Sequence, residues 1–119
     1  MIGSEINIGG GTMKALSINY EDMKWSEAMG YPTGTKMKLL REQGSARTFL
    51  LKLPAGFDME AHSHIAGEQH FVLNGEYESD GQKYGPGTYR FIPSHVNHGP
   101  FTSKNGAEIL VIWEPLKNF

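Results

Sequence analysis

The most constraining feature of this sequence is a short stretch between Gly56 and Gly75 that carries three potential metal ligands. These ligands are His62, His64 and Glu68. His62 and His64 are two positions apart, so on a β-strand both side chains would point to the same face. A turn that folds the next strand back beside the first would bring Glu68 level with the two imidazoles. Because two neutral nitrogens and one oxygen suit a divalent transition metal, the stretch predicts a metal site.

The spacing of these residues resembles the first sequence motif of the cupin superfamily. That motif is written G-x5-H-x-H-x3-E-x6-G, and the chain has the expected residue at each fixed position: Gly56, His62, His64, Glu68 and Gly75. The resemblance covers about residues 36–113 and is strongest to small single-domain cupins. These include the zinc-binding cupin domain of ChrR-type anti-sigma factors and the small cupin dioxygenases.

The second cupin motif, G-x5-P-x-G-x2-H-x3-N, is matched less completely. Gly87, Pro93 and His98 match, whereas Thr102 stands where the family often has asparagine. His95 stands where the family usually has glycine, and because histidine tolerates a left-handed backbone better than most residues, we expect it in a surface turn. The resemblance implies that one divalent transition metal (Fe, Mn, Ni, Zn, Co or Cu) is bound by four ligands: His62, His64, Glu68 and His98.

The distribution of turn signals predicts an all-β fold. Short apolar runs alternate with Gly, Pro, Asn and Asp at intervals of about 8–12 residues, with little helical periodicity. Residues 36–40 and 46–53 read as a β-hairpin, and residues 107–113 as the last strand. The cupin resemblance selects a double-stranded β-helix, or jelly-roll barrel. We expect a flexible N-terminal segment over residues 1–13 and a single cupin barrel over residues 14–119.

Composition excludes several classes of function. The formal net charge is −2, and without a basic cluster a nucleic-acid partner is not expected. No apolar run approaches the roughly 18 residues of a membrane span, so no membrane association is expected. The N-terminus has neither the basic nor the apolar region of a signal peptide. The absence of cysteine excludes disulfides and thiolate ligands, and the cytoplasm is the default compartment.

Two further polar residues fall beside the predicted site. His70 is two positions from Glu68 and should share its inward face, where it could be a donor to a ligand, a catalytic base or a substitute ligand. Arg90 lies between two aromatic residues on a predicted strand. We expect its side chain to point to water; the alternative is that it reaches into the cavity and binds a substrate carboxylate.

The last strand bears on assembly. Residues 109–113 are apolar at successive positions, and residues 71–73 are similar. A strand of a small isolated barrel needs only its inner face to be apolar. We therefore expect a homodimer in which a second subunit covers the outer face.

The predicted ligands favour an enzyme. Three neutral imidazoles and one carboxylate give a divalent ion a formal charge of about +1 and leave coordination positions open. The resemblance implies a metal-dependent oxidoreductase of the dioxygenase type, acting on a small enolisable, phenolic or carboxylate substrate. Because of its expected position on the inward face, His70 is the catalytic candidate. Two alternatives stay open: a non-catalytic cupin that senses a metal or ligand, and a cupin isomerase of sugars.

Overall fold

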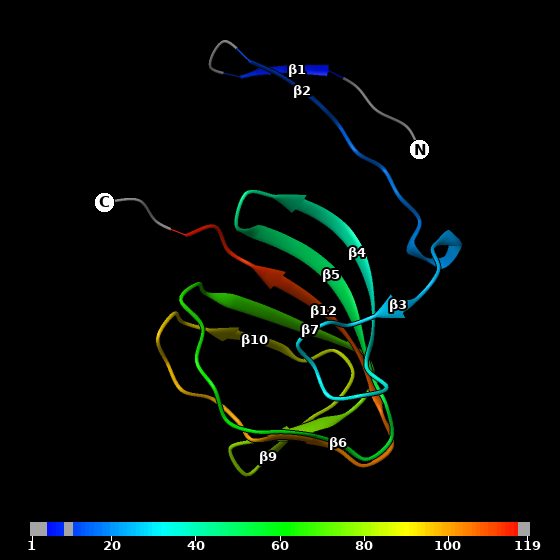
Figure 1. The fold of residues 1–119 in the computed structure, drawn as a ribbon, viewed down its shortest axis with the longest axis vertical. Coiled ribbons are helices and arrows are strands. Elements are labelled where there is room, and N and C mark those ends of the chain that lie inside the picture. Colours follow the sequence, from blue (N-terminus) through cyan, green and yellow to red (C-terminus); the bar gives the residue numbers. More distant parts are fainter. Residues whose placement is uncertain (1–4, 9–10, 117–119) are drawn as a thin grey trace.

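The structure, a computed structural model, describes residues 5–8 and 11–116, and nearly all of the regular secondary structure in these residues is β (Figure 1). The strands are β1 (Glu5–Ile8), β2 (Gly11–Lys14), β3 (Ser26–Glu27), β4 (Lys36–Gln43), β5 (Ala46–Leu53), β6 (Phe57–Met59), β7 (Glu68–Gly75), β8 (Tyr77–Ser79), β9 (Gln82–Tyr84), β10 (Tyr89–Ile92), β11 (Phe101–Ser103) and β12 (Ala107–Trp113). Within the described part of the chain, the only helix is the 3-10 turn η1 (Tyr20–Asp22), and no helix there is long and apolar enough to cross a membrane.

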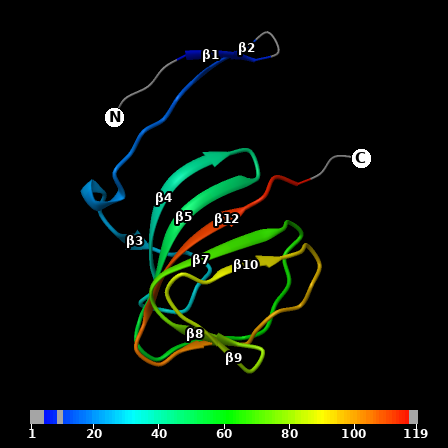
Figure 2. The same cartoon turned by 180° about the vertical axis from the view of Figure 1, so that it is seen from behind.

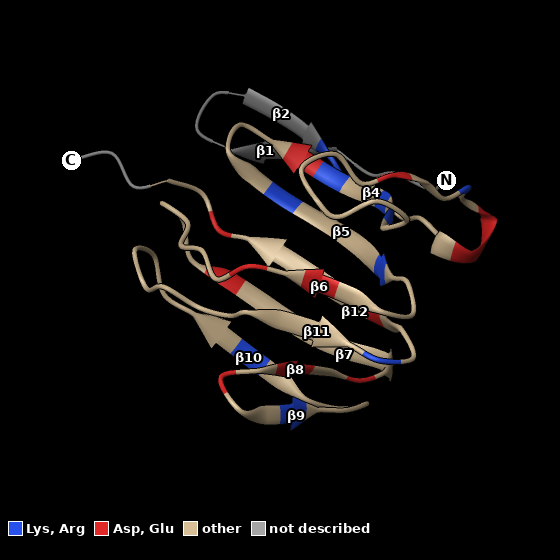
Figure 3. Ribbon diagram, turned by 60° about the horizontal axis from the view of Figure 1, so that its bottom comes forward, with Lys and Arg blue, Asp and Glu red and all other residues tan. Residues whose placement is uncertain are grey.

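Two antiparallel sheets form the barrel. The large sheet has the strand order β10-β7-β12-β5-β4-β3 and the small sheet the order β6-β11-β8-β9. Figure 3 shows the small sheet in front of the large one. The core lies between them and takes Phe49, Val72 and Ile109 from the large sheet and Tyr77 and Phe101 from the small sheet. This arrangement confirms the predicted jelly-roll cupin fold.

The strands that the sequence predicted most clearly are present. β4 and β5 form the expected hairpin, and β12 has the predicted bounds and pairs with both β5 and β7. Side chains along β12 alternate between the two faces, as the strand geometry requires. Ile109 and Val111 are buried in the core, whereas Leu110 and Ile112 lie half-buried on the outer face.

The N-terminal strands β1 and β2 pair with each other and, among the residues that the structure describes, make a separate two-stranded sheet (Figure 1). The flexibility expected of residues 1–13 and the single barrel expected over residues 14–119 stay predictions. Residues 1–4, 9–10 and 117–119 lie outside the described residues.

Gly75 stands where the chain leaves the large sheet for the small one. Its φ is 69°, in the left-handed region that favours glycine. A Cβ atom there would lie 2.2 Å from the carbonyl oxygen of Gly106 and 2.8 Å from the Cα of Ala107. The end of β7 and the start of β12, where Gly75 pairs with Ala107, therefore touch backbone to backbone, and only the absence of a side chain at Gly75 permits the contact.

We predict that Gly75→Ala lowers the free energy of unfolding by about 3 kcal/mol or more, because backbone strain and overpacking add. Gly81→Ala is the matched control: its φ is 79°, but a Cβ would meet nothing within 4 Å. This control should cost only about 1 kcal/mol. Urea denaturation measures both, and equal losses would contradict the proposed contact.

Candidate metal centre

A single β-bridge brings two of the predicted ligands together. The amide of His62 donates to the carbonyl of His98 at 2.9 Å, and the amide of His98 donates to the carbonyl of His62 at 2.8 Å. This bridge keeps the register of the β6–β11 ladder, in which Met59 pairs with Phe101. The ladder itself is interrupted between these pairs, where Pro100 has no amide to donate.

Within that interruption, the side chains that point into the barrel no longer follow strict alternation along the chain. Met59 and His62 both line the barrel interior although they are three positions apart, and so do His98 and Phe101. Strict alternation would put one member of each pair outside. Gly99, with a φ of 101°, lies in the segment where the alternation changes. The segment from 60 to 67 is consequently not a continuous strand, in contrast to the expectation for His62 and His64.

His95 confirms the prediction made for it. It is exposed, its φ is 62°, and its amide donates to the carbonyl of His64 at 2.7 Å. If the antiparallel register of the His62–His98 pair continued, His64 would pair with Val96. It pairs with His95 instead, so the segment from 95 to 98 contains one extra residue, as in a β-bulge. The left-handed residue keeps His64 paired beside the bridge.

Three imidazoles converge as a result. The centroid of the His62 ring lies 4.7 Å from that of His64 and 4.6 Å from that of His98. One ligand nitrogen from each of the three residues lies within 4.8 Å of the others. The Nδ1 of His62 lies 3.0 Å from the carbonyl oxygen of Glu60. A carbonyl can only accept, so Nδ1 carries the proton and Nε2 keeps a lone pair for a metal.

His98 provides the test of whether a metal fits. Both of its ring nitrogens are buried and, among the described residues, have no hydrogen-bond partner. A buried polar atom without a partner costs about 1–3 kcal/mol. A metal ion bound between the three imidazoles would give one of these nitrogens a partner, so the residues present fit a divalent metal.

Glu68 lies beside the three histidines. Its Oε1 accepts a hydrogen bond of 2.7 Å from Nε1 of Trp113, and its Oε2 lies 3.3 Å from Nε2 of His70 and 3.9 Å from Nε2 of His64. Burial, the largest influence, raises the pKa of Glu68. The hydrogen bonds from His70 and Trp113 and the nearby imidazoles outweigh it, so the pKa falls below its usual value. The carboxylate is therefore ionised, as a ligand must be; its place among the ligands stays a prediction.

The sequence did not identify Trp113 or Tyr77 as parts of the site. Trp113 is the cross-strand partner of Glu68, and Nδ1 of His70 lies 2.7 Å from the hydroxyl of Tyr77. Both contacts depend on strand register and sheet-to-sheet packing, for which the sequence carries no local signal.

The orientation expected for Arg90 is wrong. Its side chain is only 15% exposed and turns inward, where Nη1 donates to the Tyr77 hydroxyl at 3.2 Å. Its guanidinium lies over the ring of Tyr84 at 4.1 Å. The register explains the direction, because Arg90 pairs with the inward-facing His70.

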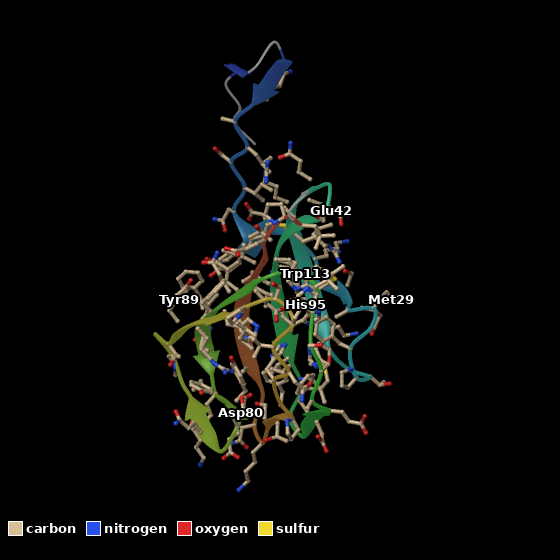
Figure 4. The ribbon with its side chains drawn as sticks, turned by 90° about the vertical axis from the view of Figure 1, so that its left-hand side faces the viewer. Met29, Glu42, Asp80, Tyr89, His95 and Trp113 are labelled. Atoms are coloured by element: carbon tan, nitrogen blue, oxygen red, sulfur yellow. The ribbon has the colours of Figure 1, made fainter. Side chains whose placement is uncertain are left out.

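Space beside the site is unequal on its two sides. Inside the barrel, next to His98, His70 and Glu68, the cavity measures about 30 Å³, which is room for roughly two water molecules. On the open side, a hollow of about 550 Å³ is lined by Met29, Tyr31, Pro32, Asp58, Met59, Glu60, His62, His64 and Trp113. In Figure 4, Trp113 lies near the middle of the molecule and Met29 projects at its edge. A substrate therefore has much more room in this hollow, beside His62 and His64, than in the cavity inside the barrel.

The jelly-roll barrel and the three converging histidines define a cupin. A family model described as the ChrR cupin-like domain matches residues 13–117, and the chain belongs to this family. No curated protein sequence matches it significantly.

Solved structures resemble this chain at low sequence identity. ChrR of Rhodobacter sphaeroides, an anti-sigma factor in complex with SigE, is 24% identical with a TM-score of 0.66; the match covers 81% of this chain and 52% of that one, so this chain spans about half its length. KdgF of Halomonas sp. is 20% identical with a TM-score of 0.67, covering 87% and 96% of the two chains. An acetylacetone dioxygenase of Acinetobacter johnsonii is 19% identical with a TM-score of 0.71, covering 91% and 78%. At these identities the likeness shows the fold alone.

The buried imidazole of His98 predicts a pH dependence of the metal-free protein. Burial first, and then the neighbouring His62, lower the pKa of His98 from 6.5 to about 4. The unfolded chain thus binds a proton that the folded chain rejects, so stability is complete above pH 6.5 and falls as the pH drops toward 4. His98→Asn should flatten this loss, by at most about 1.4 kcal/mol per pH unit. Urea titrations at several pH values measure it, and parallel profiles would contradict the account.

Proposed function

We propose that this protein is a mononuclear metal-dependent oxidoreductase of the dioxygenase type. The observation that supports it best is that the three-histidine cluster opens, through the partly exposed His62 and His64, onto a hollow large enough for a small molecule. One divalent transition metal would be held by His62, His64 and His98, with Glu68 as the fourth ligand. Such a metal, when bound, would stabilise a deprotonated enol or phenol and allow O₂ to react with it.

The walls of the hollow favour a neutral, largely apolar substrate. Met59, Trp113 and Tyr31 provide apolar surface, and among the described residues that line the hollow the charged ones are Asp58 and Glu60, both acidic. These acidic groups disfavour a carboxylate or phosphate along this wall, whereas a bound metal with a formal charge of about +1 would attract an anionic oxygen to itself. A small β-diketone or phenol, which is neutral until it loses a proton, fits this lining better than the carboxylate substrates that the sequence left open.

Tyr31 supplies a hydrogen-bond donor at this site. It lines both the hollow and the inner cavity. Burial, and then the charge of Glu68, raise the pKa of Tyr31. Its hydroxyl therefore stays protonated at neutral pH and can donate to a substrate oxygen, which orients the substrate toward His62.

The first prediction concerns the metal. The double variant His62→Ala/His98→Ala should lose stoichiometric metal, because two of the three converging nitrogens are gone. His95→Gly is the matched control, since it removes an exposed histidine outside the cluster and restores the residue usual in the family. Elemental analysis after dialysis measures both. Unchanged metal content in the double variant would rule out the assigned ligands.

The second prediction concerns the reaction. Protein reconstituted anaerobically with Fe²⁺ or Mn²⁺ should consume O₂ when a β-diketone or a catechol from a panel is added. Tyr31→Phe should raise KM more than it lowers kcat, because the hydroxyl is assigned to substrate orientation. An oxygen electrode measures the rates. Absence of O₂ uptake with every member of the panel would contradict the proposed activity.

A non-catalytic sensor is the second proposal, and the match to the ChrR cupin-like domain family supports it. In that case the metal would be a zinc ion closed by four protein ligands, as in structural zinc sites. Exchange of bound water, measured by relaxation in the Mn²⁺-loaded protein, separates the two proposals. Exchange supports the enzyme, and its absence supports the sensor.

We also propose a homodimer in the cytoplasm. The outer face of the large sheet carries an apolar row in which Leu110 pairs with Phe71 and Phe71 with Tyr89; Phe71 is 37% and Tyr89 50% exposed. A second copy of the chain would cover this row. Phe71→Lys should shift sedimentation toward the monomer, whereas Glu78→Lys, on the small sheet, should not. A wild-type monomer at all concentrations would overturn this proposal.

A further inference from the structure

A chain of polar side chains leads from Glu68 through His70 and Tyr77 to Arg90. Oε2 of Glu68 lies 3.3 Å from Nε2 of His70, Nδ1 of His70 lies 2.7 Å from the Tyr77 hydroxyl, and that hydroxyl accepts from Nη1 of Arg90 at 3.2 Å. His70 and Arg90 are cross-strand neighbours on β7 and β10, and Tyr77, the first residue of β8 in the small sheet, contacts both. Figure 2 shows the three strands β7, β10 and β8.

The two ends of this chain fix the direction of every hydrogen bond in it. A guanidinium can only donate, so the Tyr77 oxygen accepts from Arg90. An ionised carboxylate can only accept, so Nε2 of a neutral His70 must carry the proton that faces Glu68. Nδ1 of His70 is then an acceptor, and the single proton of the Tyr77 hydroxyl points to it. Donors and acceptors alternate in one direction from Arg90 to Glu68.

The packing around the chain holds these groups in place. Tyr77 is 1% and His70 7% exposed, so water does not compete for their hydrogen bonds. Arg90 is held by the Tyr84 ring beneath its guanidinium and by Asp80, whose carboxylate lies 3.9 Å from Nη2. A fixed donor therefore stands at the start of the chain.

We propose that Tyr77 and Arg90 are positioning residues: they hold neutral His70 in the Nε2-protonated form, and His70 with Trp113 orients the Glu68 carboxylate for the metal. Each carboxylate oxygen then has one dedicated donor, Trp113 for Oε1 and His70 for Oε2. This inference rests on the proposed metal function. It also selects, among the roles open to His70, that of a donor to a ligand.

The first experiment needs no metal. Long-range ¹H–¹⁵N spectra of the metal-free protein at neutral pH should show His70 protonated on Nε2. In Tyr77→Phe, which removes only the hydroxyl, the ¹⁵N shift of Nδ1 should move toward that of a nitrogen without a hydrogen bond. In Tyr84→Phe the spectrum of His70 should be unchanged, because no hydrogen bond of the chain uses that hydroxyl. A wild-type His70 protonated on Nδ1 would overturn the proposal.

The second experiment measures affinity for Zn²⁺ by competition with a chelator. Loss of a residue that supports a ligand costs about 10–100-fold in metal affinity. Because Tyr77 acts through His70, we expect about tenfold weaker binding in Tyr77→Phe, at the lower end of this range. Arg90→Gln should weaken binding in the same direction, and Arg90→Lys, which keeps a charged donor, should restore part of it.

The outcomes separate this inference from the function on which it rests. Binding in Tyr77→Phe as tight as in Tyr84→Phe would overturn the positioning role while leaving the metal site intact. A wild-type protein that binds no stoichiometric Zn²⁺ would instead contradict the metal function. The nitrogen of His70 that carries the proton in the metal-free protein would still decide whether the hydrogen bonds from Arg90 to Glu68 are all donated in one direction.

Discussion

The reciprocal pair of backbone hydrogen bonds between His62 and His98 is the contact on which the candidate site depends. These residues are far apart in sequence, and their pairing continues the register of β6 and β11 after the ladder has been interrupted at Pro100. An interruption of that kind loses a hydrogen bond. In return, the alternation of side chains shifts by one residue in both segments, 59–62 and 98–101. The imidazoles of His62 and His98 therefore both point into the barrel, as Met59 and Phe101 do.

The polar groups around this pair differ in whether they have a hydrogen-bond partner. One oxygen of the Glu68 carboxylate accepts a hydrogen bond from Trp113 and the other lies 3.3 Å from Nε2 of His70, and Nδ1 of His62 has a carbonyl acceptor. His98 is the exception, because both of its buried nitrogens are without a partner among the described residues. Folding of the metal-free protein therefore bears a cost that a bound ion would remove. A site in which the groups around His98 have polar partners, while the buried nitrogens of His98 have none, is suited to bind a metal ion.

The sequence predicted those features that depend on local pattern. Turn residues and alternation located the β4–β5 hairpin and the whole of β12, and the cupin motifs located the three histidines that converge. Even the left-handed backbone of His95 followed from the glycine usual at that position. The role of Glu68 as a ligand is still a prediction, although its position beside the histidines is consistent with it.

The features that the sequence missed depend on contacts between strands. Arg90 points inward because of its pairing with His70, and a single strand of four residues carries no information about that register. Trp113 and Tyr77 contact the site from another strand and from the opposite sheet. The change of face between Met59 and His62 is likewise invisible to a rule of strict alternation.

The central claim is that three imidazoles bind one metal ion, and X-ray absorption spectroscopy of the metal-loaded protein tests it most directly. The account predicts one ion per chain with a first shell of nitrogen and oxygen atoms and outer-shell scattering that fits three imidazole rings. Scattering that fits one ring or none, or a metal content well below one per chain, would contradict it.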